Sequence, residues 1–276
     1  MSLIGTILGL KLNKGENMIN ELFKKLSELE QVEAIALGGS RAGEHFDESS
    51  DYDVYLYCSK KIPLEQRKSL LSQYCSTMEI GNQFWEEEDN CVLNNGIDID
   101  VLYRNLDEFE DDLASVVEKY QARNGYTTCM WYNLQTCKII YDRDGRLQKA
   151  KDRFSVSYPQ PLRKNIIQRN WQLLHAYLPS YERQINKAVK RNDIISMNHR
   201  VTAFFESYFD LIFALNNQLH PGEKRLISLC KERCKILPHN FEENLKKLLE
   251  DLYTSPSNTA KNLENIITEL EKILDK

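Results

Sequence analysis

The sequence predicts an α/β domain followed by an all-helical domain. Up to residue 157, helical patterns alternate with short apolar runs that read as strands. After Tyr158-Pro159-Gln160-Pro161 the strand patterns vanish and only long helical patterns follow. The 276 residues suffice for two modest domains. We therefore expect a first domain at 18–157, a helical domain at 158–276, and an N-terminal extension at 1–17.

The composition is that of an ordinary globular protein, with 28% charged and 42% hydrophobic residues. The formal net charge of −5 argues against a long nucleic acid as partner, but not against a nucleotide held in a local site. No stretch is long enough to cross a bilayer. Seven scattered cysteines without a CxxC pair favour free thiols in a reducing cytoplasm.

The elements of the first domain follow from hydrophobic spacing. Apolar residues at helical intervals predict helices at 18–30, 63–78 and 106–121. Apolar or alternating runs predict strands at 32–38, 53–58 and 96–104, and a strand, turn and helix start across 138–147. The stretch 82–93 could be a pair of strands with an acidic turn. In the second domain we expect helices at 162–178, 181–217, 223–235, 240–251 and 257–274.

A glycine pair follows the first predicted strand directly. Gly38 and Gly39 let the backbone turn tightly and approach a ligand closely. If a helix starts at Ser40, its free N–H groups favour a phosphate, to which Ser40 can add a hydroxyl donor and Arg41 a positive charge. Taken alone, the same pattern also fits a simple helix cap.

Two pairs of aspartates lie on predicted strands. Asp51 and Asp53 are two residues apart at the start of one strand, so their side chains point to the same side. Asp98 and Asp100 repeat this spacing on a later strand, opposite its apolar face. Crowded carboxylates repel each other unless a cation lies between them, and their hard oxygen atoms suit Mg²⁺ or Mn²⁺. Alternatively, Asp98 and Asp100 lie on the solvated face of an edge strand.

The combination is more specific than its parts. A phosphate-binding turn, an Asp-x-Asp pair and a third carboxylate on a neighbouring strand supply what a two-metal nucleotidyl transfer needs. Gly39-Ser40, Asp51-x-Asp53 and Asp100 within GIDIDVLY resemble the DNA polymerase β-like nucleotidyltransferase superfamily. Within that superfamily they look like the minimal, antibiotic-modifying branch, which includes lincosamide and aminoglycoside nucleotidyltransferases. The string FALNNQLHPGEKRL at 213–226 is similar to the helical domain of uncharacterised bacterial relatives.

This resemblance implies a twisted mixed sheet flanked by helices, an NTP substrate, expected to be ATP, and a divalent metal. Asp51, Asp53 and Asp100 would be metal ligands and catalytic residues, with Asp100 as general base; Asp98 is the alternative third carboxylate. Gly39, Ser40 and Arg41 would bind the nucleotide. The helical domain would close the cleft and supply the acceptor pocket, and its Lys224 could reach a phosphate, although a solvated lysine at a helix start is an equal alternative.

Three functions stay open on the sequence alone. The first is transfer of a nucleoside monophosphate, expected to be AMP, to a hydroxyl of a small molecule such as an antibiotic. The second keeps this chemistry and transfers to tRNA or to a protein, as toxin-like members of the superfamily do. The third is a nucleotide-binding module without catalysis, which the presence of all three carboxylates disfavours. The sequence leaves the oligomeric state open.

Overall fold

The computed structural model describes residues 14–42 and 50–274 and divides the chain into two units. The first unit contains Met1–Asp111 and Leu134–Ser155, and the second contains Asp112–Asn133 and Val156–Lys276. The third crossing between the units, after Ser155, lies two residues before the sequence-based boundary at 157. Residues 112–133, by contrast, belong to the second unit although they precede that boundary.

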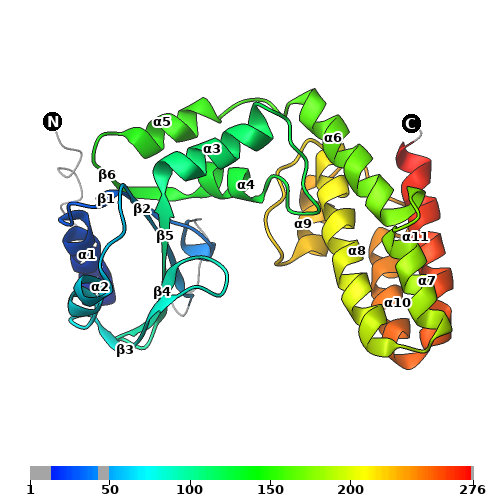
Figure 1. Cartoon of the computed structure of the whole chain (residues 1–276), viewed down its shortest axis with the longest axis horizontal. Helices are drawn as coiled ribbons and strands as arrows, with labels where there is room; N and C mark the ends of the chain where they lie inside the picture. Colours follow the sequence, from blue (N-terminus) through cyan, green and yellow to red (C-terminus); the bar gives the residue numbers. More distant parts are fainter. Residues whose placement is uncertain (1–13, 43–49, 275–276) are drawn as a thin grey trace. The chain divides into compact units, whose positions relative to one another are not determined.

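The first unit is built on a six-stranded mixed sheet with the order β3-β4-β5-β2-β1-β6 (Figure 1). Strands β2 and β5 are parallel, and every other neighbouring pair is antiparallel. The strands are β1 (Val32–Leu37), β2 (Tyr52–Cys58), β3 (Cys75–Asn82), β4 (Glu88–Leu93), β5 (Asp98–Asn105) and β6 (Lys138–Asp142).

One face of this sheet packs against α1 (Lys14–Ser27) and α2 (Leu64–Leu71), which lie on the same side of it in Figure 1. Val54 and Leu56 of β2 and Ile99 and Val101 of β5 are fully buried in this core. Because side chains alternate along a strand, the residues between them project from the opposite face. That opposite face therefore carries the aspartates of both strands.

The opposite face is polar at one end of β2 and β5 and aromatic at the other. Towards the ends of the strands, Tyr57 contacts Phe109 of α3 (Leu106–Val117) with ring centroids 5.3 Å apart. The buried guanidinium of Arg104 lies 4.1 Å above the Tyr55 ring and pairs with Glu86 at 2.7 Å. This packing fixes α3 against the carboxyl ends of the strands and leaves the aspartates at their amino ends.

The second unit is helical, so the predicted fold class is confirmed: a mixed sheet with helices followed by an all-helical region. Phe204, Tyr208, Phe213 and Leu245 are among the fully buried residues of its core. Its elements are α4 (Cys129–Thr136, shared with the first unit), α6 (Gln160–Trp171), η3 (Gln172–Ala176), α7 (Tyr181–Lys190), α8 (Ile194–Leu215), α9 (Leu226–Arg233), α10 (Phe241–Thr254), η4 (Pro256–Asn258) and α11 (Thr259–Leu274). The remaining helix, α5 (Arg146–Arg153), belongs to the first unit.

Three local predictions are wrong, and one helix is missed. The helix expected at 181–217 is two helices, because Asn192 takes a left-handed φ of 51° and the Asp193 side chain caps α8 by accepting from the Ser196 N–H. The helix expected to reach residue 78 ends at Leu71, and β3 begins four residues later. The first helix begins at Lys14, inside the expected extension 1–17. Helix α4 carries no clear sequence pattern and was not expected.

Stretch 82–93 contains only the last residue of β3, then an acidic turn at 83–87 and the whole of β4, so the acidic turn is confirmed but only one strand lies within the stretch. All seven cysteines have free thiols, as predicted. Within the described ranges, the chain has no helix of sufficient length and apolar character to span a bilayer.

Candidate active site

The parallel register of β2 and β5 places two of the predicted aspartates side by side. Asp53 pairs directly with Asp100, one residue after Tyr52 pairs with Ile99. Neighbouring strands lie about 4.8 Å apart, and directly paired residues of parallel strands project to the same face. Both aspartates are half-buried and lie on the face opposite the core. The two carboxylates thus lie side by side on this face of the sheet.

The predicted glycine turn closes onto this pair. The Gly38 N–H donates to the Asp53 carbonyl at 2.8 Å, and Gly39 follows with a φ of +57°. A Cβ at Gly39 would lie 1.8 Å from Oδ2 of Asp53, so no larger residue fits beside that carboxylate. A Cβ at Gly38 would lie 2.3 Å from the Tyr55 ring. Both glycines are therefore required by close approach to β2.

Arg41 ties the glycine turn to the start of β2. It lies in the short 3-10 turn Ser40–Ala42, and its Nε donates to the carbonyls of Ser50 and Asp51 at 2.7 and 3.2 Å. Its guanidinium also lies 3.8 Å from the centre of the Tyr52 ring. Arg41 therefore holds the backbone that precedes Asp53. Asp51 itself is exposed and lies just before β2.

The surroundings of Asp98 and Asp100 differ. Asp98 is exposed, and within the described residues its side chain makes no hydrogen bond. Asp100 is half-buried, and its Oδ1 accepts from Nδ2 of Asn90 at 2.8 Å. Asn90 is the residue of β4 that pairs with Asp100. A fixed rotamer and the pairing with Asp53 favour Asp100 over Asp98 as the third carboxylate.

Sequence reasoning did not single out Asn90. Its strand lay in a stretch left open between strand and turn, and only the register shows which residue it faces. The alternation becomes visible only in the structure, where Asp89, Cys91 and Leu93 are buried at alternate positions of β4. Asn90 therefore had to point to the other face, where the aspartates lie.

The chemistry of these groups suits a hard divalent cation. Asp53 and Asp100 offer oxygen ligands from adjacent strands, and Gly39, which contacts Asp53, contributes no side chain there. Among the residues that the structure describes, however, no three His, Cys, Asp or Glu side chains are gathered into a metal-holding group. The two adjacent carboxylates fit Mg²⁺ or Mn²⁺, with further oxygens to come from phosphates.

The other nucleotide-binding candidates stay predictions. The backbone of Ser40 belongs to the 3-10 turn beside the glycines, while its side chain lies outside the described part of the structure. Lys224 is an exposed residue of the second unit, in the turn before α9. The predicted approach of Lys224 to the carboxylates is therefore still to be tested.

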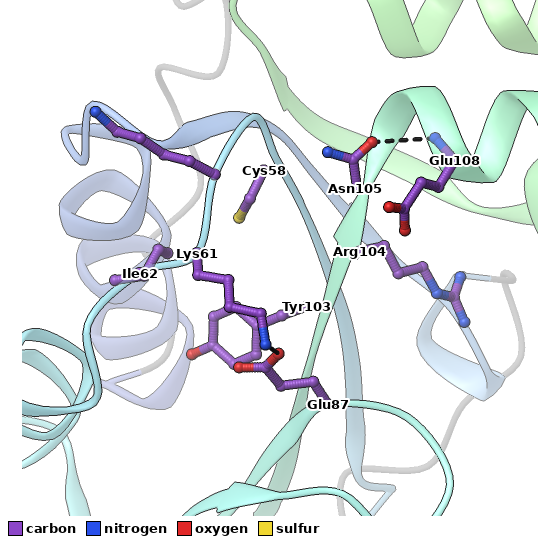
Figure 2. Close-up of a pocket in the computed structure, with 9 residues that line it drawn as sticks. Cys58, Lys61, Ile62, Glu87, Tyr103, Arg104, Asn105 and Glu108 are labelled. Atoms are coloured by element: carbon purple, nitrogen blue, oxygen red, sulfur yellow. Dashed lines mark hydrogen bonds and ion pairs between the residues drawn. The ribbon is translucent and has the colours of Figure 1, made fainter.

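A separate cavity of about 270 Å³ lies at the other end of the same two strands (Figure 2). Cys58 and Asn105, which end β2 and β5, contribute to its lining. Burial raises the pKa of the Cys58 thiol to about 12, so it stays protonated and is a poor nucleophile. The Lys61 ammonium pairs with Glu87 at 2.9 Å, as Figure 2 shows. Five residues of strand, about 16 Å, separate this cavity from Asp53, and its groups do not suit nucleotidyl transfer.

A family model described as a domain of unknown function (DUF4037) matches residues 128–226, a little over a third of the chain. No curated protein matches the sequence.

Solved structures that resemble the chain include the following three, all at low identity. A nucleotidyltransferase-like protein from Exiguobacterium sibiricum 255-15 is 10% identical with a TM-score of 0.43, over 94% of this chain and 74% of that one. An aminoglycoside 6-adenyltransferase from Bacillus subtilis is 12% identical with a TM-score of 0.29, over 96% and 92% of the two chains. The Thermotoga maritima CCA-adding enzyme, complexed with tRNA, is 11% identical with a TM-score of 0.27, over 96% and 83%. Likeness at this level carries no argument about activity, which must come from the site.

Proposed function

We propose that this protein is a metal-dependent nucleotidyltransferase that moves a nucleoside monophosphate, AMP in our proposal, from an NTP to a hydroxyl of a small-molecule acceptor. One observation carries the proposal: Asp53 and Asp100 are direct partners on parallel strands, and the Gly38-Gly39 turn closes against Asp53. The site thus has adjacent carboxylates and, beside them, the start of a turn whose N–H groups can meet phosphate.

Asp51, Asp53 and Asp100 are the residues that would hold Mg²⁺, and a bound Mg²⁺ would neutralise phosphate charge and acidify the attacking hydroxyl. The turn at 38–42 would bind the triphosphate through its backbone N–H groups and the Ser40 hydroxyl. Arg41 would keep this turn attached to the start of β2 through the carbonyls of Ser50 and Asp51. Every role except that of Arg41 follows the sequence-based expectation.

Asp100 would act as the general base. Its carboxylate accepts the proton of the acceptor hydroxyl while that oxygen bonds to the α-phosphorus and the bond from the α-phosphorus to the pyrophosphate oxygen breaks. Asn90 occupies Oδ1 of Asp100, so Oδ2 is the atom available for this proton. No histidine is needed, because an acidified hydroxyl requires only a weak base.

The acceptor defines the test. Pyrophosphate release is measured with each of the four NTPs and Mg²⁺ over a panel of antibiotics, tRNA and proteins, and products are weighed by mass spectrometry. We expect a small molecule to gain the mass of one AMP residue. A gain on tRNA or protein would keep the chemistry and change the acceptor. NTP binding without modification of any acceptor would favour a non-catalytic module.

A further inference from the structure

A chain of side-chain carboxamides crosses three strands and ends on Asp100. Nδ2 of Asn82, at the end of β3, donates to Oδ1 of Asn90 on β4 at 2.7 Å. Nδ2 of Asn90 then donates to Oδ1 of Asp100 on β5 at 2.8 Å. All three side chains are half-buried. The two hydrogen bonds therefore run in one direction, from the edge strand to the candidate base.

The direction of this chain is fixed by Asn82. A carboxamide can present either its NH₂ group or its oxygen to a neighbour. Asn82 uses Nδ2 towards both Glu79, at 3.3 Å, and Asn90. Because Asn90 receives a donor on its oxygen, its own NH₂ group has to face Asp100. The orientation of the Asn82 carboxamide thus fits that of Asn90, whose NH₂ group donates to the Asp100 carboxylate.

We propose that Asn90 and Asn82 are positioning residues that orient the Asp100 carboxylate for metal binding and proton transfer. The proposal rests on the nucleotidyltransferase function proposed above. Nδ2 of Asn90 holds Oδ1, so Oδ2 of Asp100, which accepts nothing from the described residues, is directed to the ligand side. Partners that orient a metal-binding carboxylate in this way typically change metal affinity or activity by roughly 10- to 100-fold when they are removed.

The same arrangement explains the choice between the two aspartates of β5. Asp98 pairs with Val92, which has no polar group to offer, whereas Asp100 pairs with Asn90. Only Asp100 therefore has an oriented carboxylate. The chain of carboxamides marks the functional member of the pair.

The test uses single substitutions in the full-length protein. Asn90→Ala removes the donor to Asp100. Asn82→Asp keeps the shape of residue 82 but leaves it only acceptors, so it no longer donates to Asn90 and competes with Asp100 for the NH₂ group of Asn90. Gln83→Glu is the matched control, because it adds the same negative charge one residue further along at an exposed position.

Two readouts separate positioning from a merely structural role. Mn²⁺ affinity is measured by electron paramagnetic resonance with and without a non-hydrolysable ATP analogue, and kcat and KM for pyrophosphate release are measured with Mg²⁺. We expect Asn90→Ala and Asn82→Asp each to weaken Mn²⁺ binding and lower kcat by roughly 10- to 100-fold, with the KM for NTP and the melting temperature unchanged. Gln83→Glu should behave as the unmodified protein.

Unchanged Mn²⁺ affinity and kcat in Asn90→Ala would overturn the proposal, as would a loss that follows a lowered melting temperature. If the unmodified protein transfers nothing but binds Mn²⁺, and both variants weaken that binding, the proposed function fails and the positioning role stands. If the unmodified protein does not bind Mn²⁺ at all, the positioning role falls with the metal site.

Discussion

Two aspartate sites of this molecule differ in burial and in the number of hydrogen bonds that their carboxylates accept. In the second unit, the Asp210 carboxylate is 1% exposed and accepts three hydrogen bonds, from the N–H and hydroxyl of Thr127 at 3.0 and 2.7 Å and from Nδ2 of Asn170 at 2.9 Å. In the first unit, Asp53 and Asp100 lie side by side and half-buried, and Asp100 receives one such bond.

The difference indicates separate roles. The partners of Asp210 come from the loop before α4 and from α6, so this carboxylate joins segments of the fold. Asp53 and Asp100 are two carboxylates on adjacent strands, an arrangement that a bound cation would stabilise. We infer that Asp210 stabilises the structure, whereas the pair on the sheet is arranged for a ligand.

The largest difference between the two sites is expected when one carboxylate of each site is neutralised. Asp100→Asn should lower kcat for nucleotidyl transfer by about 10²- to 10⁴-fold, because the general base is lost. NTP binding should persist through the glycine turn and Asp53. Asp210→Asn should leave kcat per folded molecule unchanged. Full activity of Asp100→Asn would remove it as the base and make Asp98 the next candidate.

For the free energy of unfolding, the larger effect is expected at Asp210 and the smaller at the carboxylate pair. Asp210→Ala leaves two Thr127 donors and one Asn170 donor without their acceptor, and we expect the free energy of unfolding to fall by about 3 kcal/mol in urea titrations. Asp53→Asn keeps the size of a half-buried side chain and removes one of two neighbouring carboxylates, so its free energy of unfolding should fall by less than that of Asp210→Ala. Asp53→Asn as the more destabilising of the two would contradict the division of roles.

A smaller effect is expected at the glycine turn. Ser40→Ala should weaken NTP binding by about 1.5–3 kcal/mol, the contribution of a hydrogen bond to a charged group, as measured by calorimetry with Mg²⁺. Ser69→Ala, on the exposed side of α2, is the control and should bind NTP normally. Equal affinities in the two variants would reduce Ser40 to a helix cap.

Two buried groups of the second unit should contribute to the pH dependence of stability. Burial raises the pKa of Asp210 to about 6 from 3.8, so its contribution to stability is lost as the pH rises from about 4 to 6. Burial lowers the pKa of His220 to about 4 from 6.5, so its contribution is lost as the pH falls from 6.5 to 4. The two slopes oppose each other, each with a limit of about 1.4 kcal/mol per pH unit.

Substituting Asp210 or His220 should separate their contributions to the pH dependence of stability. In urea unfolding at pH 4, 5 and 6, His220→Phe should lose stability more steeply with rising pH than the unmodified protein does. Asp210→Asn should gain stability with rising pH. Identical profiles for the three proteins would show that neither group titrates in this range.

Much of the fold could be predicted because periodicity is local. Val32–Leu37 and Tyr52–Cys58 read as buried strands from their own residues, and strict alternation in β5 separates Ile99 and Val101 from the aspartates. The break between α7 and α8 was missed because it depends on one left-handed residue, Asn192, within a continuous helical pattern.

The candidate site was predictable only in part. Its carboxylates and glycines stand out as residue types, but the pairing of Asp53 with Asp100 and the contact of Asn90 with Asp100 depend on strand register. Register is set by the packing of the whole sheet. The Asp210 site was missed for the same reason, since Thr127 and Asp210 are 83 residues apart.

The central claim is that Asp53 and Asp100 together bind the metal of an NTP complex. A crystal structure with Mg²⁺ and a non-hydrolysable ATP analogue tests it most directly. The account predicts Mg²⁺ about 2.0–2.1 Å from an oxygen of each aspartate, with the triphosphate against the turn at 38–42. A metal–nucleotide complex bound elsewhere, or one that contacts Asp98 and leaves Asp100 without a metal, would contradict the account.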